Sequence, residues 1–504
     1  MNKKIILTTL NARYAHASLS LRYLYANLNE LKSDSTILEF VINDNVYEMA
    51  ENILEYKPTI VGIGVYIWNA VEVQKLVSIL KKISPDTKII LGGPEVSHFP
   101  HRVNFDDADV IIQGEAEITF YNLCRNILDS GVIEQKIIKS EHVDFNNIEL
   151  PYLYYTDKDI LTRVIYVEAS RGCPFKCEFC LSSIDKTVRN LDIKIFLNQL
   201  DDLWQRGARK FKFIDRTFNL NINVTNKILD YFLEKEPPYF VHFEVIPDHF
   251  PESLKEKLKR FPPASLQLEI GIQTLNPVIA EKIERKLDFE KIRENLIFLQ
   301  NETDAHLHLD LIIGLPAESI ESFASNLNIL AKLTSSEIQL GVLKKLSGTT
   351  LSRHDQIYEM IYSDTPPYEI LQNNLLPFGL VQKMKRFARF WDLTYNSGEF
   401  KKSIVLLWPD GDVFGGFYKF SEWIFITTQT TWQISLTRLS ELLFNYLTEI
   451  LGMDKTEIAN AISGDIMKIQ GRKLPMVIRE NMSVANNIEQ KKITILNKRQ
   501  IKHL

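Results

Sequence analysis

The chain has 504 residues, 45% of them hydrophobic and 24% charged, with a formal net charge of −5. This composition predicts a globular protein of several domains, and the charge gives no support to nucleic-acid binding driven by overall positive charge. No stretch of about 20 uninterrupted apolar residues is present, so no membrane span is expected. Four cysteines in a chain of this length do not make a secreted disulfide framework, which favours a cytoplasmic location with reduced thiols.

Residues 1–145 alternate short apolar strands with amphipathic helices. The predicted strands are 4–10, 35–42, 59–67, 87–93 and 109–114, and the predicted helices are 19–31, 48–57 and 71–83. This order predicts a doubly wound, Rossmann-like parallel sheet, in which ligands bind beyond the carboxyl ends of the strands. The candidate ligand-binding residues in those loops are Tyr66, Gly92, Gly93, Gly114 and Glu115. The alternative for each glycine is a tight strand-to-helix turn.

Residues 146–345 resume the alternation with six strands. The predicted strands are 164–170, 210–215, 239–246, 265–272, 306–316 and 336–343, and the predicted helices are 193–207, 224–235, 253–261, 289–300 and 319–333. Six units fall short of a full eight-unit barrel and predict an open, partial (β/α)6 TIM barrel. Residues 346–504 are predicted to be mainly helical. Their aromatic residues are expected to pack in a core, with a substrate pocket as the alternative: Trp408, Phe414, Phe417, Tyr418 and Trp423.

Three of the four cysteines follow strand 164–170 closely. Cys173, Cys177 and Cys180 have the spacing C-x3-C-x2-C, and thiolates bind soft metals. A cubane iron–sulfur cluster normally takes four cysteines, so three leave one metal position open, as a catalytic centre requires. Cys124 lies in an apparent helix and is predicted to be a buried structural thiol. The alternative is a zinc site that borrows a ligand from elsewhere, such as His242.

The cysteine motif and the strands after it resemble the radical S-adenosylmethionine superfamily. The resemblance implies a [4Fe–4S] cluster held by the three cysteines, S-adenosyl-L-methionine chelated by the open iron, and reductive cleavage of its sulfonium to a 5′-deoxyadenosyl radical. It also implies that residues near the cysteines and at successive strand ends contact the cosubstrate: Phe179, Asp215, Arg216, Glu244, Glu269, Gln273, Asp310 and Gly314. Glu244 and Glu269 have an alternative role as buried barrel carboxylates paired with lysine or arginine, and the alternative for Asp215 and Arg216 is a pair with each other at a turn. His306 and His308 share a strand face, but without a third ligand of matching spacing they are predicted to be packing residues.

Residues 1–145 resemble the cobalamin-binding domain of one subgroup of this superfamily, through GIGVYIW, ILGGPEVS and DVIIQGEAE. The resemblance implies that the five loop residues named above surround a corrinoid. The D-x-H-x-x-G run of mutase-type domains is missing, as it often is in the subgroup. A dinucleotide, the other ligand considered, requires an early G-x-G-x-x-G run, which the sequence lacks. Residues 346–504 resemble a C-terminal domain of unknown function that accompanies this pair of domains and is implied to select the substrate.

These resemblances imply an enzyme that transfers a methyl group from methylcobalamin to an unactivated carbon or phosphorus. Two alternatives stay open. One is a radical rearrangement, cyclisation or C–S bond formation without a working corrinoid, and the other is a non-catalytic iron–sulfur or zinc sensor. The substrate, a small molecule or a peptide, is not readable from the sequence. The enzyme is expected to use an external one-electron reductant such as flavodoxin or ferredoxin.

Overall fold

The fold is described from a computed structural model, which covers residues 4–469 and 471–483. The chain divides into two compact units. The first contains Met1–Arg216, Lys344–Ser352 and Tyr362–Glu369, and the second contains Thr217–Leu343, Arg353–Ile361 and Ile370–Leu504. The domain boundaries predicted near residues 145 and 345 stay predictions, and residues 484–504 of the third predicted domain lie outside the described part.

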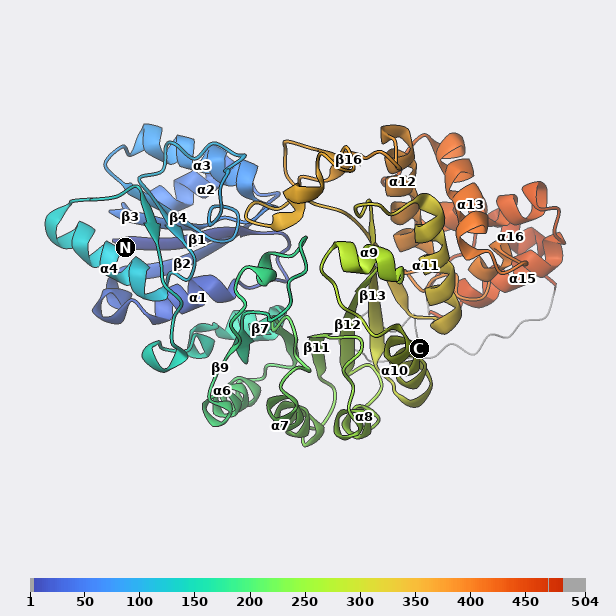
Figure 1. Ribbon diagram of the computed structural model, residues 1–504, viewed down its shortest axis with the longest axis horizontal. Helices are drawn as coiled ribbons and strands as arrows, with labels where there is room; N and C mark the ends of the chain where they lie inside the picture. The colour runs from blue at the N-terminus through green and yellow to red at the C-terminus, as the bar shows by residue number, and fades with distance from the viewer. Residues whose placement is uncertain (1–3, 470, 484–504) are drawn as a thin grey trace. The chain divides into compact units, whose positions relative to one another are not determined.

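The N-terminal sheet has six parallel strands in the order β2-β1-β3-β4-β5-β6 (Figure 1). The strands are β1 Ile5–Asn11, β2 Ser35–Val41, β3 Ile60–Gly64, β4 Lys88–Gly92, β5 Val110–Gln113 and β6 Ile137–Lys139. The five strands predicted for this region are confirmed. The sixth strand, β6, was not predicted, because its three residues are half-buried or exposed and carry no alternating pattern.

Helices cover both faces of this sheet because its central strands are buried on both sides. The helices are α1 Leu19–Ala26, α2 Val46–Leu54, α3 Ala70–Ile83 and α4 Glu117–Ser130, with a 3-10 turn at Asn29–Asp34. Successive side chains of β1 point to opposite faces. Ile6 and Leu10 pack with α2 and α3, whereas Ile5 and Leu7 pack with α1 and α4. Cys124 on α4 is fully buried in this second layer, as predicted.

The second large sheet has the strand order β14-β13-β12-β11-β10-β7. Its strands are β7 Ile165–Val167, β10 Lys210–Phe213, β11 Phe240–Val245, β12 Leu266–Gln273, β13 His306–Ile313 and β14 Glu337–Val342. Its helices are α5 Asp157–Thr162, α6 Ile193–Gln205, α7 Ile222–Leu233, α8 Glu252–Leu258, α9 Pro277–Lys282, α10 Phe289–Glu302 and α11 Ile320–Leu333. The six predicted strands form one open sheet, and the partial barrel is confirmed.

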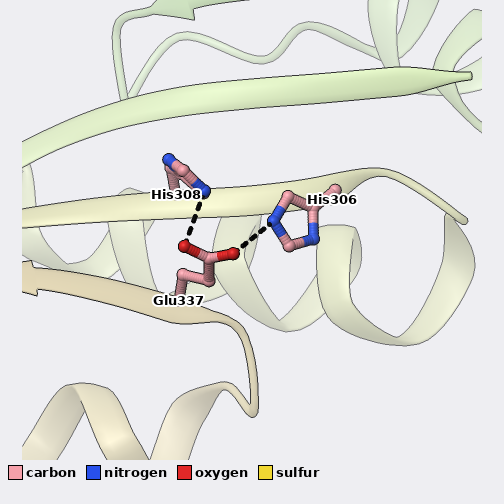
Figure 2. Close-up of side chains that lie close together, drawn as sticks. All are labelled: His306, His308 and Glu337. Atoms are coloured by element: carbon pink, nitrogen blue, oxygen red, sulfur yellow. Dashed lines mark hydrogen bonds and ion pairs between the residues drawn. The ribbon is translucent and has the colours of Figure 1, made fainter. Parts of the chain in front are cut away.

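The two faces of strand β13 differ, because apolar side chains lie on one and polar side chains on the other. Leu307 and Leu309 are fully buried, whereas the side chains of His306 and His308 alternate with them and are 9% and 12% exposed. The parallel register places His308 beside Glu337 of β14. Figure 2 shows both imidazole rings of β13 turned toward that carboxylate. Glu337 begins β14 and is 31 residues beyond His306, so no local spacing pointed to it.

The C-terminal region is mainly helical, as predicted. It contains α12 Phe378–Thr394, α13 Val413–Thr428, α14 Leu436–Asn445, a π-helical turn Tyr446–Ile450, α15 Lys455–Ile466 and α16 Met476–Asn481, after the short strands β15 Ile361–Tyr362 and β16 Ile370–Gln372. Phe387, Trp391 and Phe417 are fully buried, and Phe417 meets the other two rings edge to face, so the predicted aromatic core is confirmed for Phe417. The other four aromatic residues of that prediction are half-buried: Trp408, Phe414, Tyr418 and Trp423. Among the described residues, no helix has the length and apolarity to cross a membrane.

Candidate active site

The three clustered cysteines lie in a loop that is closed at its base. After β7 the chain forms β8 (Ser170–Arg171), which pairs antiparallel with β9 (Arg189–Asn190). The loop between them contains all three cysteines, and the backbone N–H of Cys173 donates to the carbonyl of Asp185 at 3.0 Å. The hairpin therefore presents the cysteine loop as one unit directly after a barrel strand, where this fold carries its chemistry.

The thiols of the loop are close enough to influence one another. Cys173 and Cys177 are each 8% exposed, and Cys180 is half-buried. Burial raises the pKa of Cys173, the thiols of Cys180 and Cys177 raise it further, and the guanidinium of Arg216 opposes them. None of the four cysteines, all in the described part of the chain, forms a disulfide. Three adjacent thiols fit a metal centre, because a bound metal ion keeps its thiolate ligands deprotonated.

Gly172 allows the loop to close. Its φ is +90°, and a Cβ atom placed on it would lie 1.6 Å from the carbonyl oxygen of Thr187. A side chain at this position is therefore excluded both by the left-handed backbone and by the opposite arm of the hairpin. Because Gly172 immediately precedes Cys173, this close approach fixes the backbone position from which the first thiol side chain projects.

Two arginines of the hairpin connect it to the loop after β5. Arg189 contacts both carboxylate oxygens of Glu115, at 2.5 and 2.9 Å, and also reaches Asp185 at 2.8 Å. Arg171 contacts Glu117 at 2.7 Å and Glu168 at 2.8 Å. Burial raises the pKa of Glu115, but the hydrogen bonds from Arg189 and the nearby charge of Arg171 outweigh it, so the net pKa is lowered. The Glu115 carboxylate is thus occupied by protein, and its predicted contact with cobalamin stays a prediction.

These arginines were not predicted as site residues from the sequence. Arg171 precedes the glycine of the cysteine motif and Arg189 follows the motif by nine residues, so their position beside the motif was the available signal. Their partners in the N-terminal domain, Glu117 and Glu115, lie 54 and 74 residues away in sequence. Only the tertiary fold brings the pairs together.

Asp215 is buried where β10 ends and holds the chain that precedes the cysteine loop. Its carboxylate accepts hydrogen bonds from the backbone N–H of Ala169 at 3.0 Å and from the hydroxyl of Ser170 at 2.6 Å. Burial raises the pKa of Asp215 to about 7 despite these bonds. Arg216 next to it is exposed, and Phe179 in the loop is half-buried. The predicted contacts of these three residues with S-adenosylmethionine stay predictions.

In the second unit, the remaining predicted cosubstrate residues lie on or directly after neighbouring strands. Glu244 on β11 is the register partner of Glu269 on β12, and the Glu269 carboxylate lies 2.8 Å from Nε2 of His242. The other three occur further along the strands: Gln273 at a bulge of β12, Asp310 on β13 and Gly314 just after β13. The structure therefore brings this predicted set onto three adjacent strands, and their cosubstrate roles stay predictions.

The predicted cobalamin loops of the N-terminal sheet are shaped mostly by contacts within the protein. Tyr66 stacks on Trp68 with centroids 4.5 Å apart, and its hydroxyl lies 2.7 Å from that of Ser20. Gly93 has a φ of +108°, and a Cβ there would lie 2.5 Å from the carbonyl oxygen of Val65. A glycine is thus required at this position, because the chain after β4 approaches the chain after β3 too closely for a side chain. Its cobalamin contact, like those of Tyr66, Gly92 and Gly114, stays a prediction.

A buried asparagine that was not predicted from the sequence joins the ends of β1 and β3. Asn69 is fully buried. Its amide group donates to the carbonyls of Leu10 and Gly64, and its side-chain oxygen accepts from the backbone N–H of Tyr66 at 2.8 Å. It fixes the start of the loop after β3 against the carboxyl end of β1, at the edge where this fold class binds its ligands.

A segment from beyond the barrel strands also contacts these loops within the first unit. The hydroxyl of Tyr368 hydrogen-bonds to the carboxylate of Glu95, in the loop after β4. The guanidinium of Arg102 lies 4.4 Å from the centroid of the Tyr368 ring, and Ser347 donates to the carbonyl of Pro100 at 2.9 Å. The segments 344–352 and 362–369 therefore cover part of the loop that follows β4 and contains the predicted residue Gly93.

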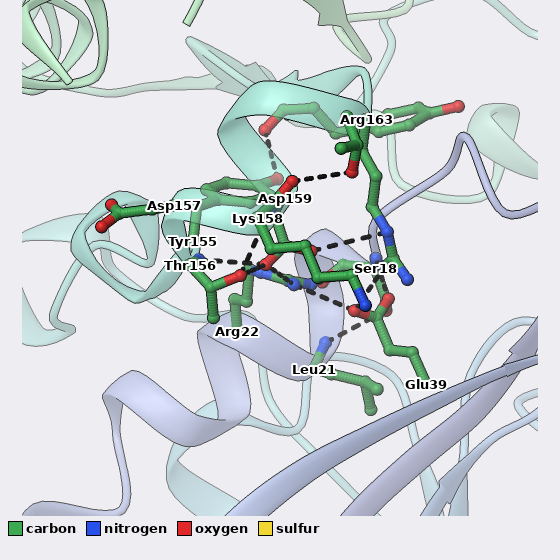
Figure 3. Close-up of polar contacts among 12 residues, drawn as sticks. Ser18, Leu21, Arg22, Glu39, Tyr155, Thr156, Asp157, Lys158, Asp159 and Arg163 are labelled. Atoms are coloured by element: carbon green, nitrogen blue, oxygen red, sulfur yellow. Dashed lines mark hydrogen bonds and ion pairs between the residues drawn. The ribbon is translucent and has the colours of Figure 1, made fainter. Parts of the chain in front are cut away.

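A buried ionic network attaches the N-terminal sheet to α5, the helix that precedes β7. Arg22 contacts Glu39 at 2.9 Å and Asp159 at 2.8 Å, and Arg163 contacts Glu39 at 2.9 Å. Figure 3 shows these side chains converging between the first helix, the second strand and α5. Buried charges require such pairing, so the network holds the start of the barrel on the N-terminal domain.

Three family descriptions match successive parts of the chain. Residues 5–124 match the B12 binding domain, residues 167–330 match the radical SAM superfamily, and residues 356–503 match a protein family of unknown function, DUF4080. Two of these regions contain the site elements described above, namely the loops of the N-terminal sheet and the cysteine hairpin.

Relatives and solved structures agree with these matches. The chain is 24% identical over 361 residues to the uncharacterized methyltransferase PH0819 of Pyrococcus horikoshii, covering 66% of this chain and 77% of that protein. It is 22% identical over 368 residues to the cobalamin-dependent radical SAM methyltransferase TokK of Streptomyces tokunonensis, covering 62% of this chain and 50% of that protein. The cobalamin-dependent S-adenosylmethionine radical enzyme OxsB, solved with aqua-cobalamin and S-adenosylmethionine, superposes with a TM-score of 0.61 at 14% identity over 92% of this chain and 78% of that one. At that identity the likeness shows the fold.

The match to the radical SAM superfamily indicates a [4Fe–4S] cluster and S-adenosylmethionine as cofactors, and the match to the B12 binding domain indicates cobalamin. The cofactor predictions are therefore confirmed. The donor set fits this assignment, because Cys173, Cys177 and Cys180 offer three thiols in one closed loop at the end of a barrel strand. The chain is therefore a radical S-adenosylmethionine enzyme with an N-terminal B12-binding domain and a C-terminal DUF4080 region.

Proposed function

We propose that this enzyme transfers a methyl group derived from S-adenosylmethionine, by way of cobalamin, to an unactivated carbon of a small molecule or peptide. The observation that carries the proposal is the double contact of Arg189 with Glu115. It ties the hairpin of the three cysteines to the loop after β5 of the B12-binding domain. A methyl relay between two cofactors requires their binding elements to be held together.

The bound cofactors supply the difficult chemistry, the cluster by one-electron reduction of the sulfonium and cobalamin as the methyl carrier. The residues of this chain bind and orient them. The three cysteines would ligate the cluster, and the positive charge of Arg216 opposes the rise that burial causes in the pKa of Cys173. Asp215 fixes the backbone before the loop through Ala169. The electron comes from an external one-electron donor such as flavodoxin or ferredoxin.

Methyl transfer is preferred to a rearrangement for two reasons. The N-terminal domain matches the B12 binding domain, which a rearrangement without a corrinoid would not require. In addition, the relatives PH0819 and TokK are both named methyltransferases. Segments 344–352 and 362–369, which contact the loop after β4, have the position expected of a cover that excludes water from the carrier.

The test is an anaerobic reconstitution with iron, sulfide and hydroxocobalamin, followed by dithionite and S-adenosylmethionine deuterated in its methyl group. A peptide and metabolite extract serves as the substrate source. We expect bound cobalamin, 5′-deoxyadenosine, and a product that carries the deuterated methyl group. Turnover to 5′-deoxyadenosine with a rearranged but unlabelled product would contradict methyl transfer, and iron without any 5′-deoxyadenosine would indicate a sensor.

Two variants test the residues. Cys177→Ala is expected to abolish both the iron chromophore and 5′-deoxyadenosine formation. Arg189→Met is expected to lower formation of the labelled product more than formation of 5′-deoxyadenosine, because it loosens the connection between the two cofactor domains and leaves the thiols in place. Equal losses of the two products in Arg189→Met would contradict the role given to the contact with Glu115.

A further inference from the structure

A second cluster of potential metal ligands lies in the barrel, apart from the cysteine loop. His306 and His308 on β13 and Glu337 on β14 bring two imidazole nitrogens and a carboxylate oxygen within 4.8 Å of one another. Because side chains of a strand alternate with a period of two, the histidines share one face. The register then sets Glu337 beside His308.

We propose that His306, His308 and Glu337 bind a divalent transition-metal ion such as Zn²⁺. Nε2 of His306 lies 3.1 Å from one carboxylate oxygen of Glu337, and Nε2 of His308 lies 2.9 Å from the other (Figure 2). Two ligand atoms each about 2.1 Å from a metal are about 3.0 Å apart at a right angle and about 3.4 Å apart at the tetrahedral angle. The observed separations are therefore within a few tenths of an ångström of those needed.

The chemistry of the donors supports a metal of this class. Two imidazoles with one carboxylate form a mixed nitrogen and oxygen set, which suits zinc and other first-row divalent ions more than calcium or magnesium. The side chains are 9%, 12% and 0% exposed, in chain order. A buried carboxylate is costly to ionise unless positive charge faces it, and a bound cation provides that charge.

His308 also has an outer partner that suits metal binding. The side-chain amide nitrogen, Nε2, of Gln339 lies 2.7 Å from Nδ1 of His308. For metal binding the amide group would turn over by 180°, so that its oxygen accepts from Nδ1–H and the lone pair of Nε2 of His308 is left for the metal. Such second contacts are usual for ligating histidines, and the two orientations of an amide fit the same position equally well.

The other acidic and histidine cluster of the described chain lacks these properties. Glu115, His142 and Asp185 also lie within 4.8 Å of one another. However, Arg189 already contacts both of their carboxylates, at 2.5 and 2.8 Å, and His142 is exposed. In that cluster the guanidinium of Arg189 already supplies the positive charge that a metal ion would provide. The cluster therefore serves as the control for the proposed site.

The position of the proposed site indicates a stabilising role. His306 begins β13 and Glu337 begins β14, so the site lies toward the amino ends of the strands, opposite the edge that carries chemistry in barrels. Strand β14 is the last of its sheet, and an edge strand has pairing on one side only. A metal bridging β13 and β14 would fasten that edge.

The test uses the full chain with Cys173, Cys177 and Cys180 all changed to alanine, so that no clustered thiol competes for zinc. After incubation with Zn²⁺ and gel filtration, metal analysis is expected to find about one zinc per chain. His308→Gln and Glu337→Gln in this background are expected to lower retained zinc at least about tenfold. His142→Gln, from the comparison cluster, is expected to retain it.

Absence of stoichiometric zinc in the parent, or unchanged zinc in both variants, would overturn the proposal. X-ray absorption of the zinc-loaded parent keeps the test independent of how the variants fold. It is expected to show nitrogen and oxygen neighbours near 2.0 Å with the multiple scattering of two imidazoles. A spectrum without imidazole scattering, or one dominated by sulfur, would also refute it.

Discussion

Replacing Gly172 with alanine tests whether the tight base of the cysteine hairpin is needed to build the metal centre. At this residue φ is +90°, and the added Cβ would lie 1.6 Å from the carbonyl oxygen of Thr187. A comfortable carbon–oxygen contact is about 3.3 Å, so the two arms of the hairpin must separate by well over an ångström. Such a shift breaks the β8–β9 pairing beside Cys173.

Gly207 provides a matched control. Its φ is +100°, close to that of Gly172, but a Cβ there would meet nothing within 4 Å. Gly207→Ala therefore carries only the backbone strain of the left-handed region, about 1–2 kcal/mol. The difference between the two variants isolates the steric effect of closing the hairpin.

The measurement is iron content and visible absorbance after anaerobic reconstitution, with circular dichroism to verify folding. We expect Gly172→Ala to retain less than about half the iron of the unchanged protein, and Gly207→Ala to retain nearly all of it, because metal sites depend on ligand geometry. Equal iron in both variants, with equal 5′-deoxyadenosine formation, would refute the argument that the close approach at Gly172 shapes the site.

Two further predictions concern buried charges. Arg22→Met removes one of the two arginines that face the buried carboxylates of Glu39 and Asp159 and leaves Arg163 as their cationic partner. It is expected to lower the free energy of unfolding by about 2 kcal/mol or more. Arg125→Met, which removes an exposed ion pair with Asp129, is expected to change the free energy of unfolding by less than about 1 kcal/mol. Urea titration measures the stability of both variants. Similar losses in the two would contradict the burial assigned to the Arg22 network. Burial raises the pKa of Asp215 from 3.8 to about 7, so the folded state holds this proton more tightly and stability should fall as pH rises from about 4 to about 7. Relative to Asp215→Asn, the unchanged protein should lose up to about 4 kcal/mol over that range, and parallel pH profiles of unfolding would disprove this.

Asp215 and Glu115 illustrate how structure refines a predicted site. The family resemblances implied a cofactor contact for each of them at a strand end, and both have protein partners in the fold: Asp215 accepts from Ala169 and Ser170, and Glu115 pairs with Arg189. Carboxylates at strand ends meet ligands and neighbouring loops at the same edge of a sheet. A position in sequence identifies that edge, but it does not distinguish a ligand contact from a contact that shapes the loop.

The sequence by itself determined the features that depend on local order. Alternating apolar strands and amphipathic helices specified two parallel sheets, because the period of the apolar residues determines which element can bury them. The spacing of Cys173, Cys177 and Cys180 specified a three-thiol metal centre, because all three ligands fall within eight residues of one loop.

Only the tertiary structure decided which distant side chains meet. Arg189 reaches Glu115 across 74 residues, and His306 meets Glu337 across 31 residues through the register of two strands. Parallel strands are joined by long crossovers, so their partners have no fixed spacing in sequence. For that reason the histidines were interpreted as packing residues, and the carboxylate that makes them a candidate metal site appeared only in the folded chain.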